Sequence, residues 1–110
     1  MGVDNEKSRL FIRLITQTDG AFLNEKQCPV LIDDDRKRAN EMVKHINKAV
    51  LEAIARQPYA SSNVLMYTIA TVVCTVLKLD YDMWKFDSEG YMETLIRHLW
   101  PAVRDMKVEY

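Results

Sequence analysis

The sequence has few of the residues that make tight turns. Only three glycines and three prolines occur among its 110 residues. All-β domains of this length need many tight turns, and such turns depend on Gly, Pro, Asn and Asp. The scarcity of these residues therefore favours a few long helices over a sheet.

Cysteine is also scarce, because Cys28 and Cys74 are the only two in the chain. A small secreted domain that is held together by disulfides uses many more. We therefore expect two free thiols in a reducing compartment, which means a cytoplasmic protein. Cys74 lies in the most apolar part of the sequence, and we expect it to be buried.

Neither sign of charge dominates, since fifteen basic and sixteen acidic residues give a formal charge of -1. A domain that gains its affinity by neutralising phosphates is usually basic overall. The balance argues against a general nucleic-acid binder, although it leaves a local basic patch open.

Long uninterrupted apolar runs are missing as well. The most apolar stretch, residues 64–79, contains three threonines and Lys78. It falls short of the roughly 18 to 20 apolar residues that cross a bilayer. The prediction is a buried core helix here and no contact with a membrane.

What remains is ordinary globular composition, with 48% hydrophobic and 28% charged residues. A chain of this length is most simply one domain, so residues 1–110 are predicted to form a single unit. Apolar residues recur at helical spacing in four segments, which predicts four helices.

The first two predicted helices cover about residues 5–18 and 36–56. Leu10, Phe11, Leu14 and Ile15 form the apolar side of the first. The second has a longer apolar stripe and is expected to be capped by one of three consecutive aspartates, which also suit the helix dipole. Its stripe consists of Met42, Val43, Ile46, Ala49, Val50, Ala53 and Ile54, and the aspartates are Asp33, Asp34 and Asp35.

The third predicted helix follows a cap at Ser61 or Ser62 and ends near residue 79. It is apolar around most of its circumference, which is typical of a central, buried helix. Thr68, Thr71 and Thr75 form a stripe along it, and such hydroxyls can bond to the carbonyl one turn earlier. Its many β-branched residues lower helix propensity, so a strand stays open as an alternative.

The fourth predicted helix covers about residues 88–106. Pro101 falls on its polar side, which predicts a bend there instead of an end. Between the first two helices, residues 19–33 are expected to lie over the core with a short helical turn at 21–25. The fold class is therefore all-α, as a single, four-helix bundle-like domain.

No catalytic, cofactor or metal signature stands out. Glu41 with His45, and Glu93 with His98, lack the Glu-x-x-His spacing of di-iron bundles. The two cysteines are far apart in sequence, unlike paired zinc ligands. A nucleophile pair between Cys28 and a histidine would need tertiary proximity. We therefore predict a protein that is not an enzyme and needs no cofactor.

The feature most suggestive of function is the aromatic segment, residues 80–87. Aromatic residues and Met are enriched in protein interfaces, and Trp and Tyr in their hot spots. The alternative is a plug that closes one end of the bundle. The candidate partner-binding residues are Tyr67, Tyr81, Met83, Trp84 and Phe86. Burial of the threonine stripe against a second copy would also favour a homodimer.

A basic group on the second helix supplies the alternative function. Its members are Arg36, Lys37, Arg38, Lys44 and Lys48. A basic helix face can lie along a phosphate backbone, although interleaved acids also fit a solvated, ion-paired face. The favoured function is a non-enzymatic, homodimeric protein-interaction or regulatory module, and the alternative is a nucleic-acid-associated regulator.

Overall fold

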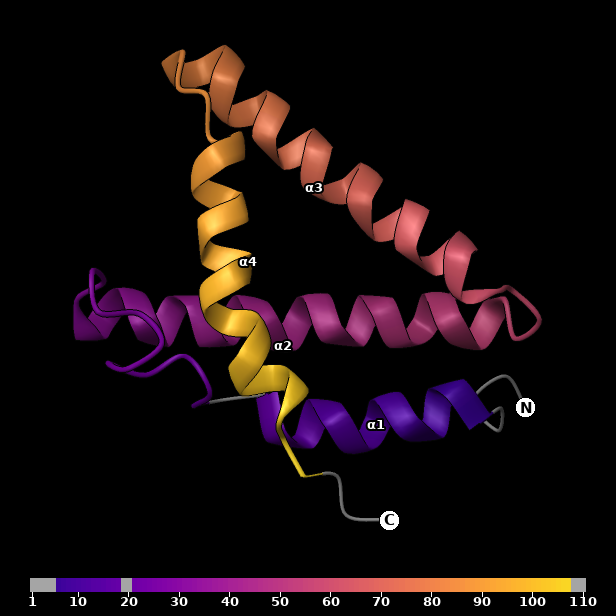
Figure 1. Ribbon diagram of the computed structural model, residues 1–110. Helices are drawn as coiled ribbons and strands as arrows, with labels where there is room; N and C mark the ends of the chain where they lie inside the picture. Colours follow the sequence, from indigo (N-terminus) through magenta and orange to yellow (C-terminus); the bar gives the residue numbers. More distant parts are fainter. Residues whose placement is uncertain (1–5, 19–20, 108–110) are drawn as a thin grey trace. The chain divides into compact units, whose positions relative to one another are not determined.

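The computed structural model describes residues 6–18 and 21–107, and this part of the chain forms four helices and no strand (Figure 1). The helices are α1 (Glu6–Thr18), α2 (Asp33–Arg56), α3 (Ser62–Trp84) and α4 (Glu89–Arg104). The all-α prediction is confirmed, and the strand alternative for the third helix is wrong.

The helix bounds differ from the predicted ones mainly at the end of α3. This helix continues past residue 79 to Trp84, so the first part of the aromatic segment is helical. The predicted start of α1 at residue 5 lies outside the described residues. Pro101 lies inside α4. The bend expected there, like the bundle arrangement, stays a prediction.

The chain divides into two compact units, which are residues 1–58 with 105–110, and residues 59–104. In the first unit, α1 and α2 run antiparallel and side by side (Figure 1). Ser8 of α1 is fully buried, and Ile54 of α2 keeps only 6% of its surface exposed. The amide of Asn47 also donates a hydrogen bond of 3.2 Å to the Thr18 hydroxyl.

Only part of the apolar stripe of α2 is covered. Val43 and Val50 are half-buried, whereas Met42 and Ile46 keep 62% and 58% of their surface exposed. The predicted stripe is wider than the short helix α1, its main neighbour within the first unit, can cover. A helix of 13 residues therefore leaves one side of a 24-residue helix open.

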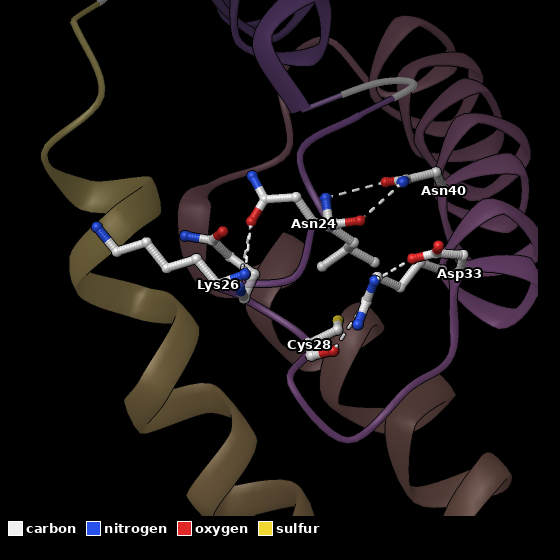
Figure 2. A network of polar contacts seen from close by, with 8 residues as sticks. Asn24, Lys26, Cys28, Asp33 and Asn40 are labelled. Atoms are coloured by element: carbon white, nitrogen blue, oxygen red, sulfur yellow. Dashed lines mark hydrogen bonds and ion pairs between the residues drawn. The ribbon is translucent and has the colours of Figure 1, made fainter.

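Residues 21–32 form turns that are tied to α2 through Asn40. The helical turn expected at 21–25 is absent from this described segment. Instead, the Asn40 side chain accepts a hydrogen bond of 3.0 Å from the Leu23 amide and donates one of 2.9 Å to the Leu23 carbonyl (Figure 2). Asn40 is 7% exposed. The connection thus lies against α2. Its backbone hydrogen bond of α-helical spacing, from the Cys28 amide to the Asn24 carbonyl at 2.8 Å, lies beyond the expected turn.

The first turn of α2 corrects the predicted cap. Ile32, not an aspartate, occupies the N-cap position, and its side chain makes no capping hydrogen bond. The three aspartates all lie within the first turn, where they complement the helix dipole. Asp33 pairs with Arg36, and Asp35 pairs with Arg38 at 2.9 Å. Asp33 and Asp35 are therefore paired with arginines one turn later and do not cap the helix.

In the second unit, α3 begins at a cap that the sequence predicted. The Ser61 hydroxyl accepts a hydrogen bond of 3.4 Å from the Val64 amide. At the other end, Lys85 adopts the left-handed conformation (φ 59°) and its amide donates to the Tyr81 carbonyl at 2.8 Å. The Ser88 hydroxyl, just before α4, donates to the Asp80 carboxylate.

No side chain of the second unit is buried, which corrects the expectation for α3. The helix was predicted to be central, yet it has no buried residue, and Cys74 is exposed. The side chains of α3 stay exposed for a geometric reason. Apolar side chains surround α3, but its unit contains only one other helix. One neighbour can cover only part of such a circumference.

Candidate protein-interaction site

The aromatic segment is open to solvent at the end of α3. Tyr81, Met83 and Trp84 lie on the last helical turns, with 50%, 60% and 63% of their surface exposed, and Phe86 follows with 65% exposed. A plug would bury at least some of these side chains. Within its own unit the segment therefore forms a surface, and the plug at the end of a bundle stays an untested alternative.

The geometry around Tyr81 holds this surface in place. The helix ends at Lys85, and the Ser88–Asp80 hydrogen bond ties the following turn back to α3. The amines of Lys78 and Lys85 lie 5.9 Å and 5.7 Å from the centroid of the Tyr81 ring. Cations at this distance interact with the face of the ring and restrain its orientation.

A hollow of about 530 Å³ adjoins the aromatic segment. It lies between α3 and the start of α4, and its lining residues are Cys74, Leu77, Lys78, Tyr81, Phe86, Asp87, Ser88 and Glu89. Lys78 is engaged in an ion pair with Asp82 at 2.7 Å. The hollow therefore combines apolar walls with the paired amine of Lys78 and the carboxylates of Asp87 and Glu89. Such a site suits an apolar or aromatic side chain of a partner.

Tyr67 belongs to a different part of α3. It precedes Tyr81 by fourteen residues, which places it about 21 Å away along the helix axis. Tyr67 is 73% exposed and lines a second hollow of about 430 Å³ together with Thr68 and Thr71. The structure therefore groups Tyr81, Met83, Trp84 and Phe86, but it does not bring Tyr67 to them.

The threonine stripe has the internal hydrogen bonds that the sequence predicted. The hydroxyls of Thr68, Thr71 and Thr75 donate to the carbonyls four residues earlier, at 2.8, 2.8 and 2.9 Å. All three side chains are exposed. The stripe is therefore exposed, and each of its hydroxyl groups already donates a hydrogen bond within α3.

An exposed apolar face runs along α3, and the sequence predicts that its residues are buried in a core, except for Met83, which it predicts to bind a partner. It consists of Val64, Val72, Val76, Leu79 and Met83, each 53% to 60% exposed. At 100° per residue these positions fall within about 120° of one another. Thr68 and Thr75 lie among them. The sequence signal for this face is that apolar residues surround the helix over residues 64–79. A small helical bundle cannot cover the whole circumference of such a helix.

The basic residues of α2 do not form one cluster. Arg36 is engaged with Asp33 and donates a hydrogen bond of 3.1 Å to the Cys28 carbonyl (Figure 2). Arg38 is paired with Asp35. Lys37, Lys44 and Lys48 remain exposed, and among the described residues no ion pair reaches them. These three lysines share one face of the helix at 100° per residue.

Within residues 6–18 and 21–107, no three His, Cys, Asp or Glu side chains gather where they could hold a metal ion. Cys28 and Cys74 are both free cysteines.

By its length and composition alone, α3 also meets the criteria for a membrane-spanning helix. An 18-residue window within it has a mean hydropathy of 1.5, and none of that window is buried. A core helix of a soluble protein passes the same test but is mostly buried. The observation adds to the conclusion that α3 lacks a covering partner within its unit.

Comparisons with models of known protein families, with curated proteins and with solved structures found no match to this chain.

Proposed function

We propose that this chain is a non-enzymatic protein-interaction or regulatory module that acts in the cytoplasm as a homodimer. A protein partner contacts the aromatic segment at the end of α3. The observation that carries this proposal is the exposure of at least half of the surface of Tyr81, Met83, Trp84 and Phe86. The exposed free thiol of Cys74 supports a reducing compartment.

The chemistry of the segment suits protein recognition. Large aromatic side chains dominate the energetics of interfaces, because they bury much surface with few rotatable bonds. Here they adjoin a hollow that can receive a side chain, and Lys78 and Lys85 surround Tyr81 with positive charge. The expected partner surface is therefore apolar at its centre.

Site-specific photo-cross-linking in the cells that make the protein tests this proposal. A photoreactive phenylalanine derivative replaces Trp84, and the matched control replaces Arg97, an exposed residue of α4. We expect protein adducts of defined mass from position 84 and none from position 97. Equal adducts from both positions, or none from position 84, would refute the proposal.

The alternative function is nucleic-acid binding through the exposed face of Lys37, Lys44 and Lys48. It predicts binding to a labelled DNA duplex or RNA that weakens steeply as salt rises, because phosphate contacts release counterions. Replacement of Lys44 and Lys48 by Glu would then abolish binding. The favoured function predicts no such binding and no effect of these substitutions on the adducts from position 84.

A further inference from the structure

We infer that two copies of this chain pair through the exposed apolar face of α3, which includes Met83 and leaves Tyr81, Trp84 and Phe86 of the aromatic segment free for a different partner. This inference rests on the proposed function and assigns the surface that forms its homodimer. Val64, Val72, Val76, Leu79 and Met83 define the face, and Thr68 and Thr75 lie among them. The hollow beside Tyr81 opens on another side of the same helix.

The electrostatics of the face favour a second copy as its occupant. A two-fold dimer brings identical surfaces together, so a charged surface would meet its own sign. The helix has no charged residue from position 62 to position 77. Asp82 lies at the border of the face and is already paired with Lys78 within the helix. The pairing therefore buries no charge that lacks a counterion.

The hydrogen bonds of the face lead to the same conclusion. The hydroxyls of Thr68 and Thr75 donate to carbonyls of their own helix. A partner that binds through hydrogen-bond acceptors would meet few free donors on this face, because the threonine hydroxyls already donate within the helix. An apolar copy of the same face leaves nothing unpaired. The face therefore selects for apolar complementarity, which its own copy provides.

The size of the face is adequate for a specific contact. Five apolar side chains, each slightly more than half exposed, span the helix from residue 64 to residue 83. With the threonines between them, two such faces would remove roughly 1,000 Å² of accessible surface, which is about the threshold for a specific interface. Both copies contribute equally, as a two-fold axis requires.

A lipid bilayer is the competing occupant, and the geometry fits it less well. The uncharged stretch from residue 62 to residue 77 measures about 24 Å as a helix. The hydrocarbon core of a bilayer is about 30 Å thick. A bilayer would therefore have to accommodate Lys78 and the adjacent Asp80, which is bonded to Ser88.

The test is the molar mass of the full chain in solution, measured by light scattering over a range of concentrations. We expect about twice the 12.8 kDa of one chain. Thr75→Lys places a charge in the face and should reduce the mass to that of one copy. Thr94→Lys is the matched control, because its exposed hydroxyl also donates to a carbonyl four residues earlier, at 3.0 Å, but lies on α4.

A second variant keeps the inference testable if Thr75→Lys impairs folding. Val72 lies near the middle of the face, so it approaches its own copy whether the two helices run parallel or antiparallel. Val72→Cys, in a chain with Cys28→Ser and Cys74→Ser, should form a covalent dimer on mild oxidation. The same change at Thr94 should not.

Three results would overturn the inference. They are a single-copy mass for the unmodified chain, equal effects of Thr75→Lys and Thr94→Lys, and a single-copy chain that co-sediments with phosphatidylcholine vesicles. The last would assign the face to a bilayer. The proposed partner contact is judged separately, because adducts at position 84 that contain a different protein would persist in the Thr75→Lys variant.

Discussion

The side-chain amide of Asn40 pairs with both backbone groups of Leu23, accepting from its N–H at 3.0 Å and donating to its carbonyl at 2.9 Å. This pair joins residues seventeen positions apart. It anchors the turns between α1 and α2 to the N-terminal third of α2, and it explains why a polar residue is among the buried side chains described in the first unit.

Asn40→Ala should destabilise the protein. Both backbone groups of Leu23 would lose their partner at a site where Asn40 itself is 7% exposed, and each unpaired buried group costs about 1–3 kcal/mol. We expect a loss of about 2 kcal/mol, since the pair is only partly buried. Urea unfolding monitored by circular dichroism measures it. Asn63→Ala, at an exposed asparagine, should change the stability by under about 0.5 kcal/mol.

Ile32→Ser should stabilise α2. Ile32 occupies the N-cap position with suitable backbone angles, yet its side chain offers no acceptor and is 66% exposed. A serine there would accept from an amide of the first turn, which is worth about 1 kcal/mol. The thermal midpoint should rise. Ile32→Ala removes the same apolar surface without supplying an acceptor, so a rise in that variant would contradict the explanation.

Glycine should have opposite effects at two lysines of the second unit. Lys85 lies in the left-handed region, where glycine relieves about 1 kcal/mol of strain. Loss of the contact with Tyr81 offsets about half of this. Lys85→Gly should therefore gain roughly 0.5 kcal/mol. Lys78→Gly, inside α3, should lose about 1 kcal/mol. Unfolding midpoints that move in the same direction for both variants would contradict this prediction.

Trp84→Ala should affect binding and leave stability nearly unchanged. Trp84 is 63% exposed, and exposed substitutions usually shift the free energy of unfolding by less than about 0.5 kcal/mol. Ile54→Ala is the contrasting variant, because Ile54 is 6% exposed and such core truncations cost about 2–5 kcal/mol. Chemical denaturation compares the two. A large loss of stability in Trp84→Ala would show that the aromatic segment supports the fold.

Much of the candidate site could be predicted from the sequence, because its aromatic residues and Met83 lie close together in the chain. Tyr81, Met83, Trp84 and Phe86 were predicted as a group, and the structure places them at one end of α3. Tyr67 is also a predicted partner-binding residue, but it lies near the other end of the helix, because residue type carries no information about distance. The basic residues were likewise counted together, whereas local aspartates engage Arg36 and Arg38.

The sequence by itself determined the helices of this protein, because helical periodicity, the cap at Ser61 and the hydroxyl bonds of the threonines all depend on residues within one or two turns. Only the tertiary structure decided which apolar side chains are covered. Burial depends on the partners that surround a helix, and neither the exposure of Cys74 nor the link between Asn40 and Leu23 is encoded in local spacing. Residues that are equally apolar in sequence therefore become core at Ile54 and surface at Val72.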